Sequence, residues 1–590
     1  MKRLLLALAG LAAIALVAFV LLHRSEPTPA AVTLLPATTV ALVDIPNFQQ
    51  CRAKVTASPV ARFWNDPAVH ACLEKQLSAT IGSQPGSSEL AAILTDVTLA
   101  LPHGEAFLAI THVTTLPALQ CTLAAGVDLY GHKLATQATL KVYEYELRKH
   151  NPAASVAVKK FRGVKYAVWQ LAPDAQLCHA FFGTLLVFTT DEATLCEMIT
   201  RAAGKADAPG LAASAGYQNI LRQLPEQRDL HAYLDVEQLV SRFSLPLRFA
   251  MPNNPLVQQL TNIQAWGTGV TFGETNITDV GVTTFTNPNQ PAPPLQQTTL
   301  AAAPADSTLY WAGTPNLAVG YRTVLDVIKL AGNRDTAQFV AGAELMLAFA
   351  GVRIDKDFLA KLGPEVAIIG NWRPGATAPD LALVAEVRDQ PALVGKFRRI
   401  TGLLDAIFKT TDAVPVADEI LHVVRTSTGY ASPAFALTDK FFVLALTADY
   451  GREIITQIKT GNTALPVAAV GNSVTYCDTR QFLAGLYSLT GSNTIAQLGQ
   501  LPEPETIAKH TGIYTATTIT TTNGSRTTTH STLGKPVTGL ITLVGAFAAA
   551  QPWLARLPVT IPGLPTKSSN TVAHLPPAGN QTATSQTPTP

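Results

Sequence analysis

The sequence predicts an α+β protein: two tandem copies of a mixed, largely antiparallel sheet with packed helices, preceded by one N-terminal transmembrane helix. Three observations predict this fold class. A series of strand and helix patterns occurs twice in the same order along the chain. Short apolar runs separated by turn residues are typical of antiparallel strands. The first 24 residues contain a long uncharged run. The 590 residues also exceed the size of a single hydrophobic core, so several domains are expected.

Residues 1–24 have the pattern of a signal-anchor. Met1-Lys2-Arg3 precedes an uncharged run from Leu4 to Leu22, close to the roughly 20 residues that cross a hydrocarbon core. The basic start predicts a cytoplasmic N-terminus, so we expect a single-pass protein of the cell (inner) membrane with the bulk of its chain extracytoplasmic. A cleaved secretory signal with a site at Thr28-Pro29-Ala30 is the alternative, and it also predicts export.

The first copy, residues 34–287, and the second copy, residues 304–535, follow one predicted order of elements. Each begins with a strand that turns into a helix, at Pro46-Asn47 and at Pro315-Asn316. A pair of strands, a helix, a hairpin, a helix, a second strand-to-helix unit and a closing hairpin come next. The later matched segments are 104–110 with 363–369, 116–127 with 380–387, 180–190 with 434–448, and 231–239 with 474–482.

Local signals support individual elements of these copies. Asp191 and Asp449 each precede apolar residues at helical spacing, which predicts that both are N-caps. The closing hairpins are predicted from about Ala265 to Thr286 and from about Gly512 to Thr532. The second of them turns at Asn523-Gly524, a strong signal for a tight hairpin turn.

Three further segments lie outside the two copies. Residues 288–303 are rich in Pro and Gln, which predicts an extended linker between the copies. Residues 536–561 are predicted to form an apolar C-terminal helix, packed or interfacial, because their uncharged run is too short to span a membrane comfortably. Residues 562–590 are rich in Pro, Thr, Ser and Gln, which predicts a disordered tail.

Composition and motifs exclude several classes of function. The 43 basic and 41 acidic residues give a net charge of +2 without long like-charged blocks, which argues against nucleic-acid binding. The signatures of dinucleotide sites, phosphate loops, zinc proteases and serine hydrolases are absent from the sequence. We therefore assign no cofactor, no metal site and no catalytic residue, and we do not expect an enzyme.

The six cysteines lack the paired spacing of a zinc site. In an oxidising compartment Cys51 and Cys72 are the better candidates for a disulfide, and Cys178 with Cys196 is a second pair. The alternative for several of them is burial as small apolar residues. Cys178 and His179 are neighbours on one predicted strand, so their side chains should point to opposite faces and not form a nucleophile pair.

Three aspartates are weak candidates for a carboxylate site. Asp44, Asp235 and Asp478 occupy comparable positions where a predicted strand passes into a helix. Paired general acid and base chemistry needs two carboxylates that converge in a cleft. Helix capping is the simpler account of carboxylates in such positions.

The chain resembles a bacterial cell-envelope family known only as a domain of unknown function. The resemblance rests on the N-terminal apolar segment, the opening strand Leu35–Val40, and the Pro59–Leu73 stretch containing Phe63-Trp64-Asn65-Asp66-Pro67. It extends over about Leu34 to Gly534. It implies an envelope setting and supplies no activity or catalytic residues.

The leading functional hypothesis is a membrane-anchored extracytoplasmic binding or scaffold protein of the bacterial envelope, attached to the membrane through its N-terminal helix. Its expected partner is another envelope protein or a lipid. One alternative is a carrier of lipid or of another apolar ligand, which the low charged fraction of 14% favours. The other is an envelope hydrolase with a dispersed carboxylate site formed by the three aspartates.

Overall fold

A computed structural model shows the fold of the chain between residues 28 and 535. The predicted anchor (1–24), C-terminal helix (536–561) and tail (562–590) lie outside the residues that it describes. Among the described residues, no helix is both long and apolar enough to cross a membrane. The described residues are 28–71, 103–114, 120–130, 132–150, 154–172, 175–242, 261–288, 291–322, 325, 334–373, 379–408, 411–425, 432–461, 465–467, 471–485 and 504–535.

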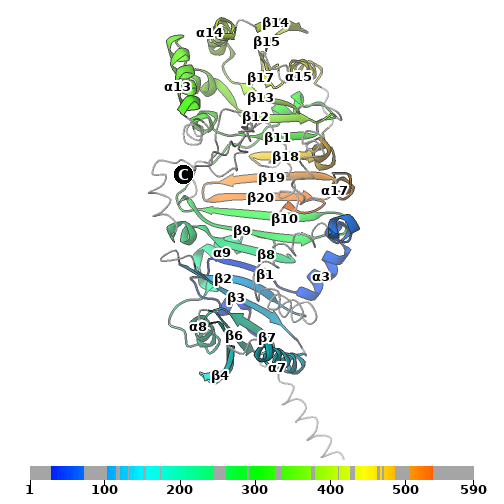
Figure 1. Ribbon diagram of the computed structural model, residues 1–590. Coiled ribbons are helices and arrows are strands. Elements are labelled where there is room, and N and C mark those ends of the chain that lie inside the picture. Colours follow the sequence, from blue (N-terminus) through cyan, green and yellow to red (C-terminus); the bar gives the residue numbers. More distant parts are fainter. Residues whose placement is uncertain are drawn as a thin grey trace, which may run out of the picture.

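Twenty antiparallel strands form one continuous sheet (Figure 1). Across the sheet, the first ten follow the order β4-β5-β6-β7-β3-β2-β1-β8-β9-β10. Their bounds are β1 Ala41–Ile45, β2 Ala106–Thr114, β3 Gln120–Asp128, β4 Ser155–Phe161, β5 Val164–Ala172, β6 Ala175–Phe182, β7 Leu185–Thr189, β8 Leu230–Asp235, β9 Ile263–Phe272 and β10 Ile277–Phe285.

The last ten strands repeat this order as β14-β15-β16-β17-β13-β12-β11-β18-β19-β20. The antiparallel ladder between β10 and β20 joins the two sets. Strands β4 and β14 are therefore the two edges of the sheet, at opposite ends of the molecule (Figure 1). The bounds are β11 Leu309–Gly313, β12 Leu362–Asn371, β13 Asp380–Val387, β14 Thr411–Val416, β15 Glu419–Val424, β16 Ala434–Leu437, β17 Phe441–Ala445, β18 Ser473–Asp478, β19 Ile513–Thr521 and β20 Gly524–Ser531.

The structure confirms the mixed α+β class with a large antiparallel sheet, and it corrects the expectation of two tandem copies that each have a sheet of their own. The strands form a single sheet, because the closing hairpins β9–β10 and β19–β20 pair edge to edge. The structure also adds the hairpins β4–β5 and β14–β15, which the predicted order of elements lacks. Below, the first half means strands β1–β10 and the second half means β11–β20.

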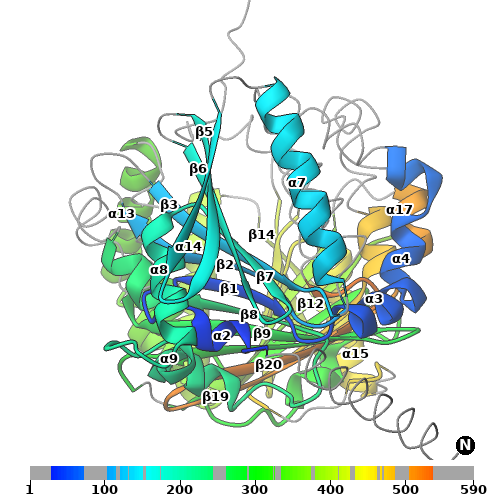
Figure 2. The same cartoon turned by 90° about the horizontal axis from the view of Figure 1, so that it is seen from below.

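Helices cover both faces of the sheet. We call face A the side that carries Leu42, and face B the side that carries Val43. In the first half, α2 (Ala31–Leu34), α8 (Glu192–Ala202) and α9 (Ala215–Leu221) pack on face A, and α7 (Lys133–His150) packs on face B (Figure 2). In the second half, the 3-10 helix η2 (Thr298–Ala302) and α15 (Ala448–Thr460) pack on face A, and α14 (Gln390–Phe408) packs on face B.

The other helices include α3 and α4, which follow β1 along the chain. Their bounds and those of the remaining elements are α3 Phe48–Ala57, α4 Pro59–Trp64, η1 Leu211–Ala213, α13 Arg334–Phe349, the π-helix η3 Ile354–Phe358, the 3-10 helix η4 Leu359–Lys361 and α17 Pro504–His510.

Helix caps decide where several of these helices begin. The Asn47 side chain accepts a hydrogen bond from the N–H of Gln50, so α3 begins directly after the Pro-Asn turn, as predicted. Asp191 caps α8 as predicted, because its carboxylate accepts from the N–H of Thr194 at 2.7 Å. The prediction is wrong for Asp449, since Thr447 caps α15 and Asp449 lies exposed in its first turn.

The Pro- and Gln-rich segment between the halves is held against the second half. The N–H of Leu295 donates to the carbonyl of Gly471, and the Asn472 amide donates to the carbonyls of Ala292 and Pro293. The Glu365 carboxylate accepts from the N–H of Thr299 at 2.8 Å. The segment therefore leads into the sheet in a fixed position.

Candidate functional site

The structure does not bring the three candidate aspartates together. Asp44 lies opposite His231 in the β1–β8 ladder, Asp235 lies at the other end of β8, and Asp478 ends β18 in the second half. Strands β9, β10, β20 and β19 lie between β8 and β18, which separates those two strands by about 24 Å at about 4.8 Å per strand. The three carboxylates therefore do not converge in one cleft.

Asp235 and Asp478 occupy equivalent positions and cap the helical turns that follow them. The Asp235 carboxylate accepts from the N–H of Gln238 at 2.8 Å. The Asp478 carboxylate accepts from the N–H groups of Arg480 at 3.1 Å and Gln481 at 3.2 Å. Capping accounts for both carboxylates.

Asp44 differs from the other two because it lies inside β1 and is buried on face A. Its carboxyl is 3.4 Å from Nδ1 of His231, and Nε2 of His231 is 3.1 Å from the hydroxyl of Tyr217 on α9. The Asp44 carboxyl also interacts with that of Glu105, which precedes β2. We call Asp44, Glu105, Tyr217, Arg228 and His231 the Asp44 cluster.

Burial controls the ionisation of the Asp44 cluster. It raises the pKa of Asp44 to about 8, with a further rise from the negative charge of Glu105. The pKa of Glu105 is also raised, mainly by burial. Burial and the charge of Arg228 lower the pKa of His231 to about 4. At neutral pH the cluster therefore contains a protonated Asp44 beside a neutral imidazole.

The second half provides an internal comparison for this cluster. Val40 directly precedes β1 and Thr308 directly precedes β11. Val40 forms backbone hydrogen bonds with β2 and β8, and Thr308 forms the equivalent bonds with β12 and β18. These bonds align β1 with β11, so Asp44 corresponds to Ala312. The β1–β8 pair Asp44–His231 is accordingly the pair Ala312–Val474 in β11–β18. The same fold thus forms without these polar groups, so the Asp44 cluster is not a requirement of the sheet.

Glu105, by contrast, has an equivalent in the second half. Both its carboxylate oxygens accept from the N–H of Ala31, at 3.1 and 2.9 Å, at the start of α2. Glu365 accepts from the N–H of Gln296 and from the N–H and hydroxyl of Thr299. Each glutamate therefore fixes the segment that enters its half of the sheet.

The Asp44 cluster is closed to substrates. Asp44 is 6% exposed and His231 is 4% exposed, and each retains a buried polar atom without a hydrogen-bond partner within the described structure. In the part of the chain that the structure describes, no group of three or more His, Cys, Asp or Glu side chains is arranged to hold a metal ion.

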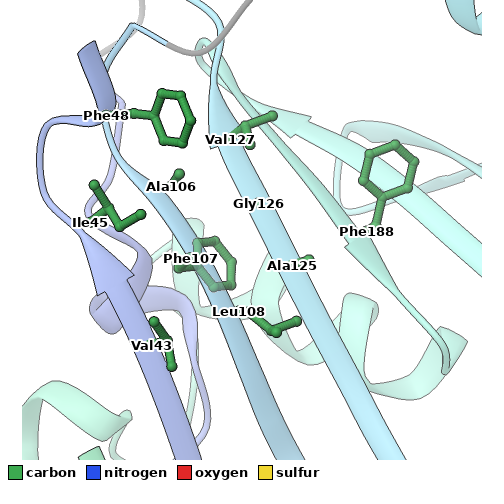
Figure 3. A pocket seen from close by; sticks show the side chains of 10 residues that line it. All are labelled: Val43, Ile45, Phe48, Ala106, Phe107, Leu108, Ala125, Gly126, Val127 and Phe188. Carbon is green, nitrogen blue, oxygen red and sulfur yellow. The ribbon is translucent and has the colours of Figure 1, made fainter. Parts of the chain in front are cut away.

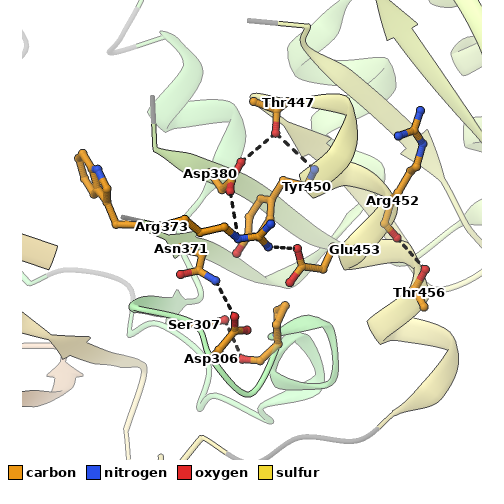
Figure 4. A network of polar contacts seen from close by, with 12 residues as sticks. Asp306, Ser307, Asn371, Arg373, Asp380, Thr447, Tyr450, Arg452, Glu453 and Thr456 are labelled. Carbon is orange, nitrogen blue, oxygen red and sulfur yellow. Dashed lines mark hydrogen bonds and ion pairs between the residues drawn. The ribbon is translucent and has the colours of Figure 1, made fainter. Parts of the chain in front are cut away.

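A second polar network lies in the second half (Figure 4). Arg373 forms ion pairs with Asp380, at 3.7 Å, and with Glu453 of α15. The hydroxyl of Thr447 donates to Asp380 at 3.0 Å. These contacts join the β12–β13 connection to the first turns of α15, and the Arg373 guanidinium is neutralised within the network. We interpret this network as a structural contact between the sheet and α15.

An apolar groove lies on face B of the first half (Figure 3). Its volume is about 250 Å³. Phe48 and Phe188 lie on either side of small residues on β2 and β3 (Figure 3). Leu108 and Val43 are 53% and 40% exposed. The residues that line the groove are Val43, Ile45, Phe48, Ala106, Phe107, Leu108, Ala125, Gly126, Val127 and Phe188.

At some positions of the groove the second half has a larger side chain. The ladders align Ala106 with Val366 and Ala125 with Leu383. Apolar residues remain exposed on face B of the second half as well, at Ile368, which corresponds to Leu108. Face B is thus apolar in both halves and hollowed in the first.

The cysteines show no site of their own in the described chain. Cys51, Cys121, Cys178, Cys196 and Cys477 are all free. The partner predicted for Cys51, Cys72, lies outside the described residues. Cys178 packs in the face A core, whereas His179 contacts Trp169 and Phe188 on face B, so the two side chains point to opposite faces as predicted.

Reasoning from the sequence missed the partners of Asp44. Asp44, Glu105 and the segment from Tyr217 to His231 lie far apart in the chain, and the sheet brings them together. One signal was present in the matched segments, where His231 aligns with Val474 in otherwise similar strands. A position that is buried and polar in one half but apolar at the equivalent residue of the other half indicates that the two halves differ in role there.

Comparison with known proteins gives a match to a family model. Residues 135–413 match the model of a family described as a protein of unknown function (DUF3352). This range runs from α7 to the start of β14, and it confirms the predicted similarity to an uncharacterised family. No curated protein and no solved structure gave a match to the chain.

Proposed function

We propose that the chain is a membrane-anchored extracytoplasmic protein of the bacterial envelope that binds a partner protein without catalysing a reaction. The apolar run at residues 4–22 supplies the anchor in this proposal, and the folded region lies outside the membrane. The observation that carries the proposal is the apolar groove on face B of the first half.

The shape of the groove favours apolar side chains of a protein as its occupant. Sites for drug-sized ligands usually enclose about 300–1,000 Å³, and the groove, at about 250 Å³, is smaller. Protein interfaces depend on a few anchoring side chains that enter pockets of this kind. The exposed side chains of Val43 and Leu108 would lose water contact when such an anchor binds.

We further propose that the chain consists of two copies of one ten-strand unit, fused through β10 and β20. The repeated strand order and the paired roles of Glu105 and Glu365 support this origin. After a duplication, one half can keep face B without a groove while the other half acquires the groove. Val43 against Trp311 and Ala125 against Leu383 are positions where the second half has the larger side chain.

Two variants test the groove. The double change Ala106→Val and Ala125→Leu introduces the residues of the second half and fills the hollow without adding charge. Ala406→Leu on the exposed surface of α14 is the matched control. The full-length chain and both variants are purified from native membranes, and the proteins and lipids they retain are quantified by mass spectrometry.

We expect a stoichiometric protein partner with the wild-type chain and the control, and at least a tenfold loss with the filled groove. Equal retention by all three chains would show that the groove is not the binding site. A lipid that is retained by the wild type and lost from the filled variant would instead support the carrier hypothesis.

A further inference from the structure

The outer surface of α7 has a composition that its packing does not require. Its inner side chains Leu140, Tyr143 and Leu147 pack on face B, at the spacing of one helical stripe. On the opposite side, Leu134 and Tyr145 are 82% and 67% exposed. At 100° per residue these two positions lie on one line, about half a turn of the helix away from the packed stripe.

Basic side chains accompany these exposed apolar residues. Lys141 and Lys149 lie on the same exposed side of α7, and so does Arg148, which forms an ion pair with Glu144 at 2.8 Å. Tyr130, three residues before α7, is 69% exposed, and Lys160 and Arg162 of the neighbouring hairpin β4–β5 are exposed. The Arg148 guanidinium contacts the carbonyl of Val156, so the end of α7 and strand β4 form one surface.

The equivalent helix of the second half shows that the fold does not need this surface. Helix α14 occupies the place of α7 between the third strand and the following hairpin. None of its described side chains is a large apolar residue that is exposed. The outward apolar residues of α7 are therefore specific to the first half.

The position of α7 relates this surface to the N-terminal segment. The hydroxyl of Thr28, the first described residue, lies 2.6 Å from that of Thr184, and the Thr184 hydroxyl donates to Asp128 at 2.6 Å. Asp128 ends β3, only five residues before α7 begins at Lys133. Leu22 is six residues before Thr28, a reach of about 20 Å when fully extended.

We propose that the outer surface of α7 rests on the anionic lipid surface of the membrane in which the chain is anchored. This inference rests on the anchor of the proposed function, because the anchor brings α7 to the bilayer. Exposed Leu and Tyr side chains bordered by Lys and Arg are typical of helices that lie in the interface of an anionic membrane. The contact would fix the orientation of the sheet relative to the membrane.

The test uses the full-length chain in proteoliposomes of phosphatidylglycerol and phosphatidylethanolamine. A photo-reactive phenylalanine analogue replaces Leu134 or, as the matched control, Phe349 on α13, which is 83% exposed near the other end of the sheet (Figure 1). We expect lipid adducts at position 134 at least tenfold above those at position 349. The double change Lys141→Glu and Lys149→Glu should lower the adducts at position 134 several-fold, as should replacing the anionic lipid with phosphatidylcholine.

Flotation of the same proteoliposomes separates the possible failures. If the chain floats but positions 134 and 349 react equally, the anchor stands and the α7 contact is wrong. If the chain does not float, the anchor is wrong and the inference fails with it. Adducts to a protein rather than to lipid at position 134 in native membranes would also overturn it. Binding at the groove is measured separately and decides none of these outcomes.

Discussion

Single residues in this chain show their roles most clearly when the two halves are compared. Asp44 and His231 are buried polar residues where the second half has Ala312 and Val474. A buried polar pair without full hydrogen bonding lowers stability relative to an apolar pair. Its presence in one half only therefore indicates a role other than holding the sheet together.

Asp44 gives a prediction about pH. Its pKa is raised from 3.8 to about 8 in the folded chain, so folding takes up a proton in this interval and Asp44 lowers stability increasingly as pH rises from 4 to 8. Asn resembles the protonated carboxyl. Asp44→Asn should therefore raise the unfolding temperature little near pH 4.5 and by several degrees at pH 8, as measured by thermal unfolding at both values.

The matched control is Asp235→Asn on the neighbouring strand. Both Asp235 oxygens accept hydrogen bonds, from the N–H and from the side-chain amide of Gln238. We expect this change to lower the unfolding temperature, because Asn has only one acceptor oxygen. A Tm difference between Asp44→Asn and wild type that is the same at both pH values would contradict the assigned ionisation of Asp44.

At the scale of elements, the sequence predicts what depends on neighbouring residues. The turn at Asn523-Gly524 and the Pro-Asn helix starts were predictable because local backbone geometry decides them. The cap of α15 was assigned two residues too late, since Thr447 and Asp449 are both common capping residues. The hairpins β4–β5 and β14–β15 were missed because their strands do not belong to the segments whose similarity was recognised.

The cap assignment gives a second prediction. Thr447→Ala should destabilise the first turn of α15 by about 1 kcal/mol, because the N–H of Tyr450 loses its acceptor. Asp449→Ala should change the stability of this turn by less than half as much, because Asp449 is exposed and its ion pair is with Arg452. Amide hydrogen exchange of the first turn of α15 measures both effects. Equal protection in the two variants would show that Thr447 is not the cap.

At the scale of the whole molecule, the contact that joins the two halves, the β10–β20 ladder, could not be predicted from the sequence. The β10–β20 ladder joins residues about 250 positions apart, such as Ile277 and Ser531, and no local pattern identifies it. The sequence predicted a Pro-rich linker between two copies. In the structure, hydrogen bonds of Leu295 and Thr299 attach that segment to the second half, and the halves are connected through the sheet.

A continuous sheet predicts that the two halves do not move independently. Spin labels at Glu197 of α8 and Asp449 of α15, both exposed, report the distance between the halves. We expect a single distance distribution about as narrow as that of a control pair, Glu197 and Glu226, within the first half. A hinge at residues 288–303 would instead give a broad distribution, because a flexible connection lets the halves sample many separations. A narrow distribution means that the groove on face B and the outer surface of α7, both in the first half, keep a fixed position relative to the second half.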